Sequence, residues 1–352
     1  MTKKSYLLLL TALVLGAAGL YFSLTGNQGS LHDRDRNFRL PQDADVVRLE
    51  MQKKNGESLL LAKDAEGIWH VNQAFRANES AVRELLGTLR HLNVRQPVSL
   101  AEQEQVNQAL DQQGVLVEVY ARTHWIRLPG DIRLIPRTKR VKRLLAGEDT
   151  PDGESTIMRL YRSEMPFAVH VPGVQGGFAD LFNPNESLWR DPVVVDLQAR
   201  QIRRIEVRFT ENEEESFVID NQSETPLLLH GGQAVDISLI DGTRLARYLE
   251  GFTELHYEKL MTGADNSLRM QEMFSPLFLE IVVQDQQERV TTLRFFRRKA
   301  SEEELRGLAA GTNADPNRFF LQVNEGEFAR AQYFVFNRIM RPLSYFLKAE
   351  AH

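Results

Sequence analysis

Apolar and polar residues alternate along short stretches of the chain, a pattern typical of strands with one buried face. Val47, Leu49 and Met51 recur at every second position, and Asn55-Gly56 then provides a turn before a second alternating stretch at residues 58–62. Two alternating stretches joined by Asn-Gly predict a β-hairpin. The folded part of the chain is therefore expected to begin with antiparallel strands.

A helix is predicted after a third short strand at residues 68–71. Asn78 is a suitable N-cap, because its side chain can accept a hydrogen bond from the first turn. The apolar residues that follow recur at helical spacing, at Val82, Leu85, Leu86, Leu89 and Leu92. Pro97 then ends this first group of elements.

A similar order of elements returns about 158 residues later, which indicates an internal duplication. Strands are expected at residues 202–209, 216–220 and 227–229, followed by a helix from Gly242. The second halves also correspond, with strands at 115–120, 124–128, 157–161 and 167–171 in the first half and 277–283, 290–296 and 318–323 in the second. Each half closes on a helical segment, at 177–182 and at 327–347. We expect two similar α+β domains, 45–190 and 191–352, with mainly antiparallel sheets.

The N-terminal segment differs from the rest of the chain. Residues 6–24 carry no charge, follow Lys3 and Lys4, and are long enough to span a hydrocarbon core of about 30 Å. This predicts a transmembrane signal-anchor at 1–26 and a linker at 27–44, in a single-pass protein of the bacterial inner membrane whose ectodomain lies in the periplasm. Cleavage as a signal peptide near Ala17-Ala18-Gly19 is the alternative.

Composition excludes several classes of function. The net charge is −5 and there are no cysteines, which argues against nucleic-acid binding, disulfides and thiolate metal sites. The eight histidines are scattered without metal-ligand spacing. No cofactor, metal site, small-molecule substrate or catalytic motif is predicted, and the chain is not expected to be an enzyme.

The densest basic stretch is the main candidate for an interaction surface. It consists of Arg137, Lys139, Arg140, Lys142 and Arg143, before a glycine-containing segment at 147–153. Such a stretch can bind an anionic polymer or an acidic protein surface, although a solvated mobile loop also explains it. A smaller basic group, Arg297, Arg298 and Lys299, has the same two interpretations.

Two further motifs are interpreted as structural. The acidic run at 211–215 joins two predicted strands without the spacing of a calcium loop, and therefore predicts a hairpin loop. Gly173, Gly176 and Gly177 lie between a strand and a helical segment and are expected to form a turn.

Several motifs resemble a known family. They are Gly67-Ile68-Trp69-His70-Val71-Asn72, the helix at 82–92, residues 94–99, residues 166–173, and Leu188-Trp189-Arg190-Asp191. Together they resemble the domain-of-unknown-function family 4340, in the long form found in Bacteroidota. Here Pro192 follows Asp191, where similar proteins more often continue without proline. Trp189, Arg190 and Asp191 are added to the candidate interaction surface on this basis.

The resemblance implies an N-terminally anchored envelope protein and brings no catalytic residues. Some relatives are associated with the accessory subunit of gliding-motility-type ABC transporters, which suggests a role in a transport or motility assembly. We therefore expect a membrane-anchored periplasmic scaffold or interaction protein whose partner is another envelope protein. The alternatives are a binder of an anionic envelope polymer and a cell-envelope hydrolase using Glu186, Asp191 and Asp196.

Overall fold

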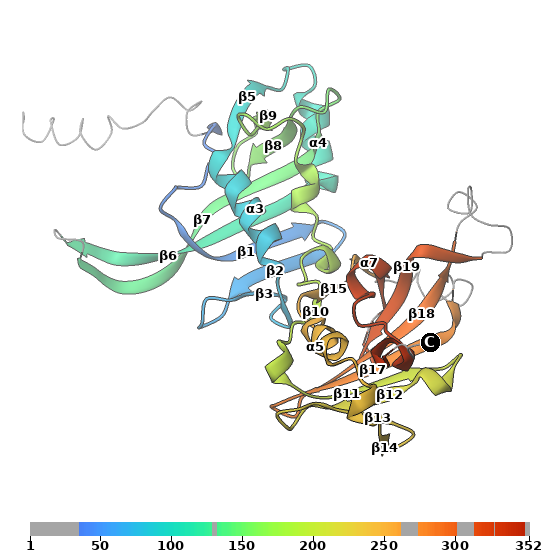
Figure 1. Ribbon diagram of the computed structural model, residues 1–352. Coiled ribbons are helices and arrows are strands. Elements are labelled where there is room, and N and C mark those ends of the chain that lie inside the picture. The colour runs from blue at the N-terminus through green and yellow to red at the C-terminus, as the bar shows by residue number, and fades with distance from the viewer. Residues whose placement is uncertain (1–34, 129–131, 262–273, 301–312, 327, 349–352) are drawn as a thin grey trace, which may run out of the picture. The chain divides into compact units, whose positions relative to one another are not determined.

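A computed structural model describes residues 35–128, 132–261, 274–300, 313–326 and 328–348 (Figure 1). Contacts divide the chain into two compact units, Met1–Arg190 and Asp191–His352. Each unit is built on one nine-stranded sheet in which the strand pairs are antiparallel. The prediction of mainly antiparallel sheets is confirmed.

The first unit has the sheet order β4-β3-β2-β1-β6-β7-β8-β9-β5. Its elements are β1 (Asp45–Lys53), β2 (Ser58–Lys63), β3 (Trp69–Val71), β4 (Phe75–Arg76), α3 (Glu79–His91), β5 (Asn93–Pro97), α4 (Gln103–Gln113), β6 (Val115–Leu128), β7 (Ile132–Asp149), β8 (Thr156–Leu160), β9 (Phe167–His170) and the 3-10 helices η1 (Ala179–Phe182) and η2 (Glu186–Leu188).

Helix α3 connects the two opposite edges of this sheet, because it leaves β4 and enters β5. Asn78 caps it as predicted, with Oδ1 accepting hydrogen bonds from the backbone N–H groups of Ser80 and Ala81. A helix of 13 residues is about 20 Å long, whereas nine strands laid flat would span about 38 Å. The sheet therefore curls around the helix, and one apolar core joins both.

The second unit has the sheet order β14-β13-β12-β11-β17-β18-β19-β20-β16, and β10 pairs with β15 beside it. Its elements are β10 (Val193–Val195), η3 (Ala199–Gln201), β11 (Ile202–Phe209), η4 (Glu213–Glu215), β12 (Phe217–Asp220), β13 (Leu227–His230), β14 (Gln233–Ala234), η5 (Ile237–Leu239), α5 (Gly242–Glu250), β15 (Leu255–His256), β16 (Lys259–Leu260), β17 (Phe274–Asp285), β18 (Val290–Lys299), β19 (Ala314–Val323), β20 (Phe328–Gln332), α7 (Tyr333–Phe336) and η6 (Leu343–Phe346).

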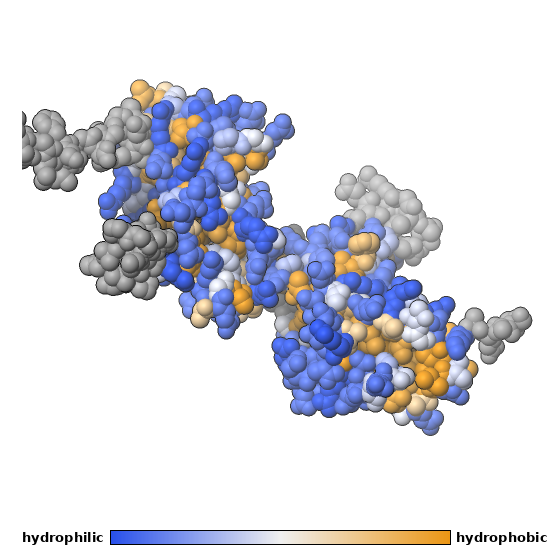
Figure 2. Space-filling model, turned by 60° about the vertical axis from the view of Figure 1, so that its left-hand side comes forward, coloured by the Kyte–Doolittle hydropathy of each residue, from blue (hydrophilic) through white to orange (hydrophobic). Residues whose placement is uncertain are grey.

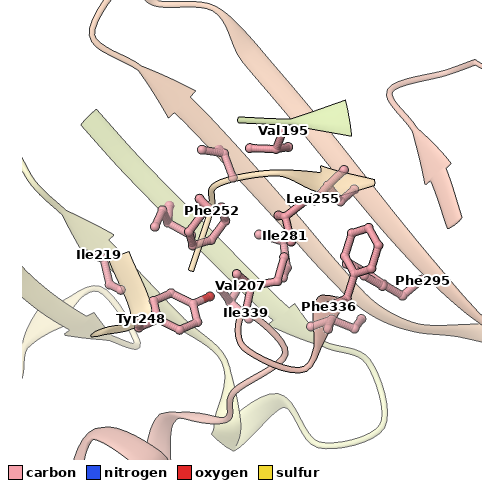
Figure 3. Packing of buried hydrophobic residues seen from close by; sticks show 14 of the residues in the cluster. Val195, Val207, Ile219, Tyr248, Phe252, Leu255, Ile281, Phe295, Phe336 and Ile339 are labelled. Atoms are coloured by element: carbon pink, nitrogen blue, oxygen red, sulfur yellow. The ribbon is translucent and has the colours of Figure 1, made fainter. Parts of the chain in front are cut away.

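The core of the second unit is strongly aromatic (Figure 3). Tyr248 of α5 packs edge-on against Phe252, Phe217 and Phe346, with ring centroids 5.5, 5.9 and 5.1 Å away. Phe336 packs edge-on against Phe295 at 5.8 Å. Such edge-to-face pairs fix the helix and the C-terminal segment on one face of the sheet.

The two sheets repeat each other strand for strand. Both orders begin with four consecutive strands in reverse order, β4 to β1 and β14 to β11, and continue through a central hairpin, β6-β7 and β17-β18. Both end on a short strand, β5 or β16, that comes after the helix and before the central hairpin in the chain. The register shift between Val46 and Arg48 in β1 recurs between Ile202 and Arg204 in β11. A bulge at the same place in both units supports a duplication rather than a general likeness.

Three sequence predictions about secondary structure are wrong. The strands expected at 115–120 and 124–128 are one strand, β6, and the basic stretch expected as a mobile loop lies in β7. The helix expected at 327–347 is instead β20, α7 and η6. Ala329 and Ala331 are buried while their neighbours are only partly so, which is the period of a strand.

Helix α4 was not predicted because it carries no apolar stripe, and only Leu110 of its residues is buried. Arg159 fixes it to the sheet. The guanidinium of Arg159 is 2.7 Å from Oδ1 of Asn107 and 2.5 Å from Oδ1 of Asp111.

The predicted transmembrane segment, residues 6–24, lies outside the described residues. Within the part of the chain that the structure describes, no helix combines the length and the apolar character needed to cross a membrane.

Candidate functional site

The β6–β7 hairpin of the first unit is longer than its counterpart in the second. The equivalence follows from the central strands: Met51 pairs with Val117, which pairs with Leu144, and Val207 pairs with Ile281, which pairs with Leu293. In the second unit the hairpin closes after Gln284 pairs with Val290. In the first unit the equivalent pair is Tyr120 and Arg140, and pairing continues outward to Leu128 and Ile132.

Residues 121–139 of the first unit thus replace residues 285–289 of the second. The paired residues 121–128 and 132–139 are called the β6–β7 ribbon below. Strand β1 accompanies β6 only as far as Arg122, and β8 accompanies β7 only from Leu144 onwards. Beyond these neighbours the described strands of the ribbon pair only with each other, and the hairpin projects from the body of the unit (Figure 1).

Strand register separates the ribbon residues by chemistry. Ile126 pairs with Leu134 and Leu128 pairs with Ile132, so four aliphatic residues occupy alternating positions on one face. The intervening positions, which belong to the other face, hold the cationic residues Arg127, Arg133, Arg137 and Lys139, and Trp125 and Ile135 lie between them. One face at the outer end is thus aliphatic, and the other is mixed cationic and apolar.

This arrangement does not favour folding of the ribbon by itself. Arg127 lies directly opposite Arg133, and like charges at paired positions destabilise a sheet. A two-stranded ribbon is also only marginally stable in water.

The basic residues at the base of the ribbon have intramolecular partners. Nη1 of Arg140 and Nε of Arg143 lie 2.6 and 2.8 Å from Oε1 of Glu118. The guanidinium of Arg143 also stacks on Tyr161, 3.3 Å from the ring centroid. These two arginines stabilise the sheet. Arg137 and Lys139 lie further out along β7, and their side chains are exposed.

Lys142 is partly buried beside the N-terminal end of the described chain. Its Nζ donates a hydrogen bond to the carbonyl oxygen of Asn37 at 2.7 Å. Burial disfavours the charged ammonium and lowers the pKa of Lys142 to about 8. Arg140, Lys142 and Arg143 of the predicted basic stretch thus all have contacts within the first unit.

Trp189, Arg190 and Asp191 do not form an exposed surface. Trp189 is 4% exposed, its Nε1 donates to the carbonyl of Asn183, and its own carbonyl accepts from the N–H of Asn78. Arg190 stacks on Phe75 at 3.5 Å. Asp191 accepts from the backbone N–H of Val193. These residues position α3 and the chain segment at the end of the first unit.

The second basic group is also engaged. Arg297 makes two contacts with the carboxylate of Glu211, at 2.6 and 3.1 Å, and these contacts lower the pKa of Glu211. Arg298 pairs with Asp315, which is 3% exposed. Arg297 and Arg298 therefore stabilise the second unit.

The carboxylates considered for hydrolysis have structural roles. Glu186 accepts from Nδ2 of Asn72 at 2.7 Å, and Asp196 accepts from the backbone N–H of Glu254 at 3.2 Å. Among the residues that the structure describes, no group of three or more histidines, aspartates or glutamates is arranged to hold a metal ion.

A cavity of about 390 Å³ lies in the first unit and was not anticipated from the sequence. Apolar residues of α4 and β7 line it together with Glu148, Asp149 and Asp180. Asp149 is held by Thr156 Oγ1 at 2.6 Å and by the N–H of Ala179 at 3.1 Å. Asp149 therefore serves to fix the loop before η1.

The two motifs interpreted as structural behave as predicted. The acidic run at 211–215 lies between β11 and β12 and includes η4. Gly173 and Gly176 have φ values of +83° and +96°, which favour glycine in a turn.

Hydrophilic residues cover most of the visible face of each unit, and apolar residues gather over part of the second (Figure 2). The most exposed large apolar residue among those described is Phe334 of α7, at 89%. A single exposed aromatic of this kind is ordinary on a protein surface.

The family model for a domain of unknown function, DUF4340, matches residues 69–271, more than half of the chain. The chain belongs to the DUF4340 family. The resemblance inferred from the sequence motifs is confirmed, and the DUF4340 match includes the whole β6–β7 ribbon. No curated protein and no solved structure matches the chain at a significant level.

Proposed function

We propose that this DUF4340 protein is a membrane-anchored scaffold or interaction protein of the bacterial cell envelope, and that the β6–β7 ribbon is the element that docks on its partner. In this account residues 6–24 anchor the chain in the inner membrane and the two sheet units lie in the periplasm. The observation that carries the proposal is the ribbon itself, which is added to a unit whose duplicate folds without it.

The charge of the ribbon segment supports an anionic partner. Residues 121–139 contain five arginines or lysines and one aspartate, a net charge of +4, in a chain whose total charge is −5. A local field opposite in sign to that of the whole molecule orients it toward anionic surfaces. An acidic protein face and an anionic envelope polymer are both compatible with this chemistry.

The cost of the ribbon also supports a binding role. Arg127 and Arg133 occupy directly paired positions in the two strands, where like charges disfavour pairing. Residues that disfavour the isolated fold are characteristic of sites that act on another molecule.

Site-specific photo-crosslinking in cells tests the proposal. A photo-reactive amino acid at Lys139, on the ribbon, is compared with the same group at Arg83, an exposed position of α3. A covalent adduct is expected from position 139 and not from position 83. It should weaken when Arg133 and Arg137 are replaced by glutamine, because the partner is anionic. Equal labelling at both positions, or none at either, would contradict the proposal.

A further inference from the structure

The structure assigns a binding pocket for a phosphate group to the first unit, at the place where β8 parts from β7. None of the described residues that line this pocket belongs to the β6–β7 ribbon, so the inference goes beyond the proposed docking role. The ligand is a small phosphate-bearing anion or the phosphate of a lipid head group.

The pocket has a basic lining and a volume of about 280 Å³. Leu160 is the last residue of β8 in the ladder with β7, and beyond it the edge of β7 is not covered by β8. The described lining residues include four cations and no carboxylate. Besides two aliphatic residues they are Asn37, Arg140, Lys142, Arg143, Tyr161 and Arg162.

Lys142 is partly buried without a counter-charge. Its Nζ lies 2.7 Å from the backbone carbonyl oxygen of Asn37 and 3.4 Å from Oδ1 of the same residue, and within the described chain no carboxylate pairs with it. Burial therefore lowers the pKa of Lys142 to about 8. A buried cation of this kind disfavours folding and is characteristic of a site that acts on a ligand. A bound dianion would supply the missing counter-charge.

The arginines of the pocket have unused hydrogen-bond donors. Arg162 is exposed and makes no hydrogen bond or ion pair with a described residue. The guanidinium of Arg143 is oriented by Glu118 and by the ring of Tyr161, while its Nη groups donate to no described residue. A fixed, planar guanidinium can bind phosphate through two parallel N–H groups.

The pocket stays strongly positive when Glu118 is included. Glu118 contacts both Arg140 and Arg143, so the four cations less this one carboxylate leave a net charge of +3. A phosphate dianion offsets more of this charge than a single carboxylate does. The volume is just below the roughly 300–1,000 Å³ of sites for drug-sized ligands, and therefore suits a phosphate group with a small substituent.

The central hairpin of the second unit lacks these charges. By the strand register that relates the two units, Lys142 and Arg143 correspond to Thr291 and Thr292. Threonine is uncharged and favourable in strands. The hairpin therefore forms at this place without either cation.

The neighbouring strand differs in the same way. The N–H of Asn324 donates to the carbonyl of Thr292 at 2.7 Å, which repeats the bond that Tyr161 makes in the first unit. Asn324 thus corresponds to Tyr161, and the residues that follow them, Glu325 and Arg162, correspond to each other. An acidic residue occupies in the second unit the position of a cation in the first, so the basic pocket is a feature added to one copy of the fold.

Chemical labelling of Lys142 tests the pocket. The full chain in neutral detergent is treated with an amine-reactive reagent at about pH 8, near the pKa of Lys142, with inorganic phosphate or with chloride at equal ionic strength. Mass spectrometry of the peptides gives the labelling rate of each lysine. Bound phosphate holds Lys142 as the unreactive ammonium, so it should slow labelling there and not at Lys54, which is exposed in another turn.

Charge reversal at Arg162 links the protection to the pocket. Arg162→Glu introduces the residue found at the equivalent position of the second unit, and should require about tenfold more phosphate, or beyond, for the same protection of Lys142. Arg83→Glu, at an exposed position of α3, is the matched control and should leave the phosphate dependence unchanged.

Two further probes distinguish the sources of the phosphate group. Slower labelling of Lys142 with glycerol 3-phosphate supports a small-molecule ligand, and slower labelling with phosphatidylglycerol vesicles alone supports a lipid head group. Unchanged labelling with all three probes, equal slowing at Lys142 and Lys54, or an unaltered response of Arg162→Glu would overturn the inference. The docking role of the ribbon is read at position 139 and is independent of these results.

Discussion

Arg143 lies directly opposite Glu118 on the neighbouring strand, with its Nε 2.8 Å from Oε1 of Glu118. Arg140, three residues earlier on the same strand, contacts the same oxygen with its Nη1 at 2.6 Å. This shared carboxylate marks the boundary between the part of β7 that belongs to the sheet and the part that projects from it.

Glu118→Gln should lower the free energy of unfolding by about 1 kcal/mol, because two partly exposed arginines lose one carboxylate. Urea denaturation measures this loss. Glu206→Gln is the matched control, since its contact with Arg204 is long, at 4.0 Å, and exposed. A loss no larger than that of Glu206→Gln would contradict the assignment of Arg140 and Arg143 to the sheet.

Lys142 predicts a pH dependence of stability. Its pKa falls from 10.5 to about 8 on folding, so the unfolded chain binds more protons between these two pH values. Stability therefore rises with pH through this window, and the full cost of burying the ammonium applies below pH 8.

Comparison with Lys142→Met isolates this contribution from other groups that titrate at alkaline pH. The stability of the wild type relative to Lys142→Met should improve steadily as the pH rises from 8 to 10.5. Denaturation curves across this range provide the measurement. A difference that stays constant with pH would show that Lys142 keeps its ordinary pKa.

Gly177 is required by close packing. A β-carbon at this position would overlap the carboxylate of Asp149, which is already fixed by Thr156 and Ala179. Gly177→Ala should destabilise the first unit by about 1–3 kcal/mol. Gly87→Ala is the matched control: no atom lies within 4 Å of the new carbon, and alanine should stabilise α3 by about 0.5–1 kcal/mol. Thermal unfolding of both variants tests the pair, and equal effects would contradict it.

The hydroxyl of Tyr248 has no hydrogen-bond partner among the described residues, although the side chain is 1% exposed. Burial raises its pKa, so the group stays neutral. Tyr248→Phe keeps the ring contacts and removes the buried unpaired hydroxyl, which should increase the unfolding free energy by about 1 kcal/mol. A comparable decrease in chemical denaturation would mean that the hydroxyl is hydrogen-bonded.

Local signals predicted much of the fold. The turn at Asn55-Gly56, the cap at Asn78 and the helical spacing after it act within a few residues, and the structure contains the corresponding hairpin and helix. The duplication was also visible, because the order of strands and helix repeats along the chain.

Long-range pairing explains what the sequence did not predict. The arginines and lysines of β7 suggested a loop, but pairing with β6 from Ile132 to Ala146 holds them in a strand. The segment after residue 327 combines alternation with aromatic residues on both sides, and the edge of β19 selects a strand there. The set of residues that share a face of the ribbon depends on the register between two strands, which spacing along one strand does not reveal.

Replacement of the ribbon tests the central claim most directly. Residues 121–139 are exchanged for Asp-Gln-Gln-Glu-Arg, the turn that closes the equivalent hairpin at 285–289. Both full chains, with the same affinity tag and matched expression, are then crosslinked in cells and purified. We predict that the variant unfolds at nearly the same temperature as the wild type but gives about tenfold less of the crosslinked adduct, because the cationic hairpin is absent. An equal yield of the same adduct from the folded variant would contradict the account.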